Sequence, residues 1–178
     1  MTKTGHIALI AAVAMAAAAA GYGLQRTQSA TPITAPATAA KLNKLKLPDA
    51  NGTVQDFSQW SGKVLVINFW ATWCAPCREE IPAFVRLSDK FSQKGVQFVG
   101  ISIDSADKVT EFAREYSVSY PLLLGTPDTL QQTVAFGNKA QALPFTVVLD
   151  TSGDARLVKL GKVAESVLDE TLTKLVGR

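Results

Sequence analysis

The only two cysteines of the chain, Cys74 and Cys77, are the residues whose spacing points most directly to chemistry. They lie in the segment Trp73-Cys74-Ala75-Pro76-Cys77, immediately after a long apolar run. Two thiols at this spacing, placed where a strand gives way to a helix, can lie within the few ångströms that a disulfide requires. The pair can therefore open and close without a large backbone movement.

The two thiols are expected to act in a fixed order, because we predict a helix that begins at Cys74. A thiol in that position lies at the positive end of the helix dipole, where unpaired N–H groups favour the thiolate. Cys74 is then the attacking sulfur, and Cys77, almost one turn further in, suits a resolving thiol. The pair would pass through a mixed disulfide and release a reduced partner. Ala75 and Pro76 set the backbone geometry between them, and so the reduction potential.

Two other uses of such a cysteine pair are a structural disulfide and a metal site. A disulfide that closes so short a loop would constrain the unfolded chain little. A zinc site would need a second pair of ligands, and the only histidine is His6, close to the N-terminus. The sequence therefore favours a redox-active dithiol, with no metal and no cofactor beyond the disulfide itself.

Glu80 follows Cys77 by three residues, so on a helix the two side chains can share one face. A partly buried carboxylate there could take the proton of Cys77, and its charge would raise the pKa of that thiol. The alternative is that Glu80 and its neighbour Glu79 merely favour the first turns of a helix.

Pro144 lies in the segment Leu143-Pro144-Phe145, immediately before a predicted strand. A proline at the start of a strand can simply be tolerated there. If its peptide bond is cis, it holds a sharp turn, and Leu143 could offer backbone groups to an extended substrate segment as an added strand. Both interpretations are open from the local pattern.

The elements that position these residues follow from the apolar pattern. The run 64–69 is typical of a central strand buried on both faces, and the spacing after it predicts a helix over 74–91 with Pro82 as a kink. Further strands are expected at 96–103, 122–124, 145–149 and 156–160, and helices at 106–116, 126–136 and 164–175, with an N-terminal hairpin over 42–57 and a tight turn at 58–62. This order predicts a layered α/β domain with a mixed sheet.

The N-terminus is predicted to direct export. Residues 7–24 are apolar and rich in alanine, so residues 1–26 are either an uncleaved signal anchor or a cleaved signal peptide. Residues 27–40 are rich in Thr, Ala and Pro and are expected to form a flexible tether before a folded domain at 41–178. With Lys3 on the cytoplasmic side, the domain would be periplasmic or otherwise extracytoplasmic, anchored in the membrane if the leader is retained.

Composition and charge narrow the class further. A chain of 178 residues with 47% hydrophobic residues has material for one folded domain after the leader is set aside. The net charge of +3 comes from scattered Lys and Arg residues, without a basic run. Nucleic acid is therefore not an expected partner.

The run Asn68 to Pro82, NFWATWCAPCREEIP, resembles the thioredoxin superfamily, and within it the TlpA/ResA-like thiol-disulfide oxidoreductases that include the CcmG/DsbE group. Segments 46–63 and 143–153 agree with the same family. The resemblance implies a thioredoxin-like α/β fold, in which a mixed central sheet has helices on both faces. It also implies an N-terminal β-hairpin extension and a central strand-helix insertion within 96–136.

The same resemblance implies a function and a set of roles. Members of the family are exported, commonly anchored by one helix, and kept reduced by a membrane thiol-transporting reductase, and several reduce apocytochrome c. By analogy Cys74 is the nucleophile, Cys77 the resolving cysteine, Glu80 the acidic residue near the thiols and Pro144 a cis-proline beside them. Asn68 stands where ordinary thioredoxin has a buried Asp, which moves the expected proton acceptor to Glu80. We expect contacts with the substrate from Trp73, Ala75, Pro76, Leu143 and Pro144.

Two alternative functions belong to other classes. Thiol peroxidases of the peroxiredoxin type share this architecture, but their reactive cysteine usually follows a Pro/Thr-rich segment, whereas Trp73 precedes Cys74 here. A thiol-based module that binds a metal ion or an unfolded client is the third hypothesis, and the scarcity of histidine weakens its metal-binding form.

Overall fold

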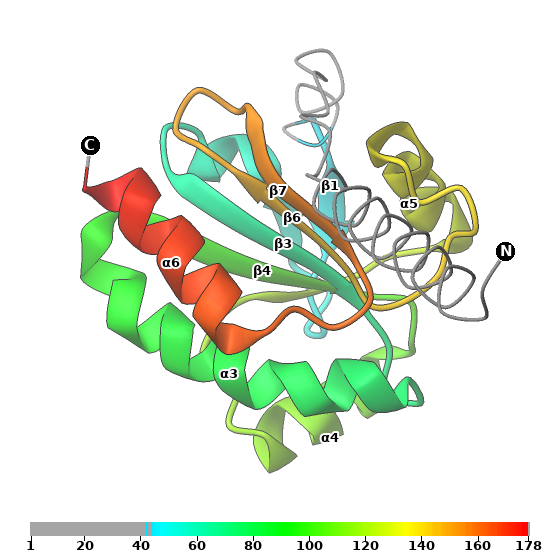
Figure 1. Ribbon diagram of the computed structural model, residues 1–178. Coiled ribbons are helices and arrows are strands. Elements are labelled where there is room, and N and C mark those ends of the chain that lie inside the picture. Colours follow the sequence, from blue (N-terminus) through cyan, green and yellow to red (C-terminus); the bar gives the residue numbers. More distant parts are fainter. Residues whose placement is uncertain (1–41, 43, 178) are drawn as a thin grey trace, which may run out of the picture. The chain divides into compact units, whose positions relative to one another are not determined.

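The computed structural model describes residues 42 and 44–177, and its centre is strand β3 (Val64–Trp70; Figure 1). The sheet has the order β5-β4-β3-β6-β7. It consists of β3 together with β4 (Val96–Ser102), β5 (Leu122–Leu124), β6 (Phe145–Leu149) and β7 (Ala155–Leu160). Strands β3, β4 and β5 run parallel, whereas β6 is antiparallel to both β3 and β7. The predicted mixed sheet is confirmed.

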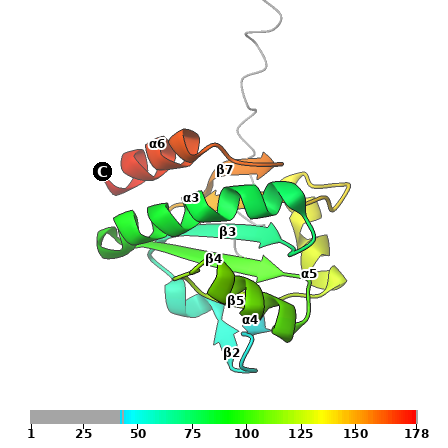
Figure 2. The same ribbon diagram turned by 90° about the horizontal axis from the view of Figure 1, so that it is seen from below.

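One face of the sheet is covered by three helices, α3 (Ala75–Phe91), α4 (Ala106–Glu115) and α6 (Glu165–Val176). Figure 2 shows α3 running along β3 on this face. The other face is covered by the hairpin of β1 (Lys46–Pro48) and β2 (Val54–Asp56), the 3-10 helix η1 (Phe57–Trp60), the short helix α5 (Pro127–Gln131) and the 3-10 helix η3 (Gln132–Phe136). All seven residues of β3 are buried, because both faces of the sheet are covered.

Alternation along β3 decides which side chains face α3. Val66 and Trp70 belong to the apolar cluster under the three helices, whereas Ile67 and Phe69 belong to the cluster on the other face. Asn68 therefore points toward α3. It is the one polar side chain of this strand, and it lies directly opposite Thr146 of β6.

Most predicted elements are confirmed, with two local differences. The helix predicted over 126–136 is α-helical only from Pro127 to Gln131 and continues as η3 up to Gly137, whose φ of 96° ends it. The tight turn predicted at 58–62 is confirmed only at residues 61–62, where Gly62 has a φ of 80°. It follows η1, which buries Phe57 and Trp60 and is capped by the side chain of Asp56. Pro82 lies inside α3, which remains one continuous helix.

The predicted N-terminal segments, 1–26 and 27–40, lie outside the described residues. Across residues 42 and 44–177, no helix has the length and apolar character needed to cross a membrane.

Candidate active site

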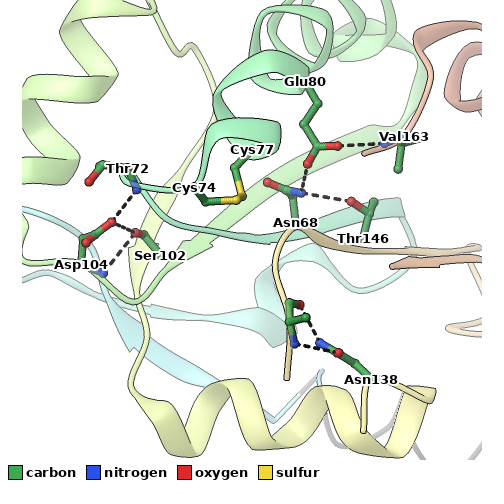
Figure 3. Close-up of a disulfide and its surroundings, with 11 residues drawn as sticks. Asn68, Thr72, Cys74, Cys77, Glu80, Ser102, Asp104, Asn138, Thr146 and Val163 are labelled. Atoms are coloured by element: carbon green, nitrogen blue, oxygen red, sulfur yellow. Dashed lines mark hydrogen bonds between the residues drawn. A yellow bond between two sulfur atoms is a disulfide. The ribbon is translucent and has the colours of Figure 1, made fainter. Parts of the chain in front are cut away.

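The cysteines form a disulfide, Cys74–Cys77, with their Cα atoms 5.3 Å apart, at the start of α3 (Figure 3). Cys74 is the N-cap residue, with extended backbone angles, and its carbonyl oxygen accepts a hydrogen bond from the N–H of Arg78 at 3.2 Å. Pro76 lies in the first turn, where a helix needs no N–H from it. The predicted place of the first thiol, at the positive end of a helix, is confirmed, with the helix beginning one residue later.

The two sulfur-bearing residues differ in exposure. Cys77 is completely buried, whereas Cys74 retains 6% of its surface. Trp73, with 66% of its surface exposed, and the exposed residues Ala75 and Pro76 surround Cys74 in the sequence. A partner can therefore approach the disulfide only from the side of Cys74.

Glu80 is fully buried one turn after Cys77, on the face of α3 that covers the sheet. Its two carboxylate oxygens accept hydrogen bonds from Asn68 Nδ2 at 2.8 Å and from the N–H of Val163 at 2.9 Å. Burial raises the pKa of Glu80 to about 7, although these two hydrogen bonds and the charge of Lys162 act in the opposite direction. The group can therefore exchange a proton near neutral pH beside a disulfide.

Glu79 has a different environment. It is exposed and forms an ion pair with Lys162, with 2.9 Å between carboxylate oxygen and ammonium nitrogen. Of the two consecutive glutamates, only Glu80 faces the interior.

The peptide bond between Leu143 and Pro144 is cis. Pro144 is buried, and its carbonyl oxygen accepts a hydrogen bond from the N–H of Gly161 at 2.8 Å. Leu143 is half-buried and packs against both apolar clusters. Within the described part of the chain, its backbone N–H and C=O have no hydrogen-bond partner. The hypothesis that a substrate segment pairs here as an added strand requires such a donor and acceptor.

Asn138 holds the segment that leads to this turn, a role that its place in the sequence did not predict. The Asn138 side chain is fully buried, donates to the carbonyl oxygen of Ala142 at 3.0 Å and accepts from the N–H of Ala142 at 2.9 Å (Figure 3). Its amide also donates to Thr133 Oγ1 at 3.0 Å. The signal available was weak, since a single Asn in a loop is most often a turn residue.

Asp104 was also missed, and it holds the loop between β3 and α3. Its Oδ2 accepts a hydrogen bond from the N–H of Thr72 at 2.6 Å, and its own N–H donates to Ser102 Oγ at 3.2 Å (Figure 3). Thr72 lies 32 residues earlier in the chain. Because β3 and β4 are parallel, their carboxyl ends meet at one edge of the sheet, and this pairing was the signal that could have found it.

The described residues contain no group of three or more His, Cys, Asp or Glu side chains that could hold a metal ion.

The chain matches a known protein family. The AhpC/TSA family profile matches residues 37–158. The thiol-disulfide oxidoreductase ResA of Bacillus subtilis is 30% identical over 125 residues, which cover 70% of this chain and 68% of ResA.

Two solved structures are similar to this chain in fold. A thiol:disulfide interchange protein of the thioredoxin family from Chlorobium tepidum is 26% identical, with a TM-score of 0.68. The match covers 75% of this chain and 93% of the Chlorobium chain. A secreted thiol-disulfide isomerase from Corynebacterium glutamicum is 25% identical, with a TM-score of 0.69. The match covers 76% of this chain and 84% of the Corynebacterium chain. The predicted thioredoxin-like fold is confirmed.

Proposed function

We propose that this chain, which belongs to the AhpC/TSA family and is a ResA-like thiol-disulfide oxidoreductase, reduces disulfide bonds of exported proteins. The observation that carries the proposal is the Cys74–Cys77 disulfide at the start of α3, of which only Cys74 reaches the surface. An asymmetric pair of this kind suits an exchange reaction with a second protein, because one sulfur meets the partner and the other completes the reaction.

The reaction starts from the reduced dithiol. The Cys74 thiolate attacks one sulfur of the substrate disulfide, forms a mixed disulfide and expels the other substrate sulfur as a thiolate, which takes up a proton. Cys77 then loses its proton and attacks Cys74 Sγ, which forms the Cys74–Cys77 disulfide and releases the second substrate thiolate. Two electrons pass from the dithiol to the substrate, and a thiol donor must then reduce the protein again.

Glu80 is the proton acceptor that we assign to the second step. Its carboxyl group is buried one turn from Cys77, and its pKa of about 7 allows it to take up a proton at neutral pH. Substrate binding is assigned to the exposed residues Trp73, Ala75 and Pro76 and to the turn of Leu143 and Pro144. There the backbone N–H and C=O of Leu143, which have no partner among residues 42 and 44–177, would pair with an extended segment.

The substrate class that we propose is an exported protein with a disulfide in a Cys-x-x-Cys-His haem-attachment segment, as in apocytochrome c. The family resemblance supports this choice and supports a membrane thiol-transporting reductase as the electron donor. Export is supported by the predicted leader and by the secreted relative from Corynebacterium glutamicum.

The reduction potential tests the direction of the reaction. Equilibration with glutathione buffers should give a value nearer to about −270 mV, which is typical of reductants, than to about −120 mV, which is typical of strong oxidants. A value near the oxidant end contradicts the reductant assignment. Rapid stoichiometric consumption of peroxide by the reduced protein, without reduction of a model disulfide, would instead support the peroxidase alternative. Tight Cu(I) binding without disulfide reduction would support a binding module.

Trapping tests the substrate and the order of the two cysteines. The Cys77→Ala variant should accumulate a mixed disulfide through Cys74, both with a disulfide-bridged Cys-x-x-Cys-His peptide and with the physiological client, which mass spectrometry identifies. The matched Cys74→Ala variant should capture neither. Capture by Cys77 in that variant would reverse the assigned roles.

A further inference from the structure

Two buried side-chain polar atoms lack a hydrogen-bond partner among the described residues, and one of them, Asn68 Oδ1, belongs to the active site. The other, Trp70 Nε1, faces β4, since a Cβ atom added at Gly100 would lie 3.0 Å from it. A buried acceptor without a partner costs free energy, so it calls for an explanation. The function proposed above assigns no task to Asn68.

The orientation of the Asn68 amide is determined by its nitrogen. Nδ2 donates to Glu80 Oε1 at 2.8 Å and to Thr146 Oγ1 at 3.0 Å, so both of its hydrogens are used on one side. The oxygen must then face the other way. Figure 3 shows it turned toward the Cys74–Cys77 disulfide.

The topology explains what lies on that side. Helix α3 begins just after β3 and runs back along it, so residues nearer the start of α3 cover residues nearer the end of β3. Glu80 is bonded to Asn68, and Cys77, one turn closer to the start of α3, is buried on the same face. Cys77 therefore lies on the side of Asn68 to which Oδ1 points.

In the disulfide form, neither sulfur carries a hydrogen, so neither can donate to this oxygen. Reduction by two electrons leaves Cys74 at the surface, as the thiolate of the proposed mechanism, and a protonated Cys77 in the interior. The fully buried Cys77 S–H is then the new donor on that side of the amide. We propose that Asn68 is a positioning residue whose Oδ1 accepts a hydrogen bond from the Cys77 S–H in the reduced protein, while its Nδ2 holds Glu80. The inference rests on the proposed exchange function.

Two consequences follow from this arrangement. The hydrogen bond exists only in the reduced form, so it stabilises the dithiol relative to the disulfide and makes the reduction potential less negative. The same amide also fixes both the thiol that gives up a proton and the carboxylate that we expect to take it. Asn68 then performs a task that an ionised carboxylate at this position could not perform, because an ionised carboxylate only accepts hydrogen bonds and has no hydrogen to donate to Glu80.

The first test compares the glutathione equilibrium of the full chain with those of Asn68→Leu and Thr146→Val. Asn68→Leu removes the acceptor, so the equilibrium constant with glutathione should shift about tenfold toward the disulfide. For a two-electron couple this shift makes the reduction potential ~30 mV more negative. Thr146→Val removes a hydrogen bond on the other side of the amide and should change the constant less than twofold. Equal shifts in the two variants would overturn the proposal, as would no shift in Asn68→Leu.

The same comparison in a Glu80→Gln background separates the effect of Asn68 Oδ1 on the Cys77 thiol from the effect of Asn68 Nδ2 on the Glu80 carboxylate. The Asn68→Leu shift should persist there, because it comes from the thiol and not from the carboxylate. Its disappearance would overturn the proposal.

The second test does not depend on whether Asn68→Leu folds. In the reduced Cys74→Ser variant, Cys77 is the only thiol, and its infrared S–H stretching band should lie below that of a model thiol in an apolar solvent. A band at the position of the free thiol would overturn the proposal. Both tests use the protein without a client, so the two proposals can fail separately. A wild-type dithiol that does not exchange with glutathione refutes the proposed function. If the wild-type dithiol does exchange, but the Asn68→Leu shift or the lowered S–H band is absent, only the role of Asn68 is refuted.

Discussion

Two neighbouring glutamates show how much a single position on a helix decides. Glu79 and Glu80 are adjacent in the sequence, yet Glu79 is exposed and paired with Lys162, whereas Glu80 is buried against Asn68. The spacing of three residues from Cys77 favours Glu80 already in the sequence, and the structure places that carboxyl group in the interior. Its part in catalysis is the prediction that follows.

Glu80→Gln should slow the second step of exchange by about a hundredfold, a loss within the range expected when a general base is removed. Rapid-mixing kinetics measure the rate at which a preformed mixed disulfide on Cys74 releases a model thiol. In the wild type, the release rate should rise with pH around 7, because the pKa of Glu80 is raised to about 7 and only the ionised carboxylate accepts a proton.

Glu79→Gln is the matched control, since it removes the same charge one position away on the exposed side of α3. It should leave the release rate within about twofold of wild type, as expected of a surface ion pair. Equal losses in the two variants would show that only the general field of the carboxylates matters and would contradict a specific role for Glu80.

At the scale of elements, the loop between β3 and α3 is fixed by a contact with the end of the neighbouring strand β4. Asp104→Ala removes the acceptor of the Thr72 N–H, whose bond is 2.6 Å long, and so should lower the free energy of unfolding by about 1–3 kcal/mol. Urea denaturation of the oxidised protein measures this change. Because the loop carries Trp73 and Cys74, the rate of mixed-disulfide formation should fall as well.

The controls for this prediction come from the same region. Asp104→Asn retains an oxygen acceptor and should recover most of the stability, whereas Glu111→Ala, at an exposed position of α4, should stay within about 0.5 kcal/mol of wild type. A stable Asp104→Ala variant with unchanged exchange kinetics would show that the loop holds its geometry without this contact.

The elements could be predicted from the sequence because their signals are local. The apolar run of β3, the period of α3 and the glycine after η3 each lie within one stretch of chain. The contacts of Asp104 and Asn138 could not be predicted in the same way, because they depend on which strand ends meet and how a loop folds back. The 3-10 continuation after α5 was missed because a helical period does not distinguish the two kinds of helix over so few residues.

At the scale of the whole molecule, the buried carboxyl group of Glu80 links the active site to global stability. Its pKa rises from an ordinary value of 4.5 to about 7 in the folded protein, because burial disfavours the charged form. Between these two values the native state retains a proton that the unfolded chain has lost. The native state therefore binds more protons than the unfolded state, and the free energy of unfolding must fall as pH rises through this range.

The size of this loss can be tested with a single substitution. A shift from 4.5 to about 7 corresponds to about 3 kcal/mol, absent below pH 4.5 and complete above pH 7. Glu80→Gln cannot ionise, so its unfolding free energy minus that of wild type should increase by about 3 kcal/mol between pH 4.5 and pH 8. Urea denaturation of the oxidised full-length proteins at several pH values measures this difference, with Glu79→Gln as the control. A difference that stays constant over this range would mean that the pKa of Glu80 is not raised by folding, and the predicted rise of the release rate around pH 7 would lose its physical basis.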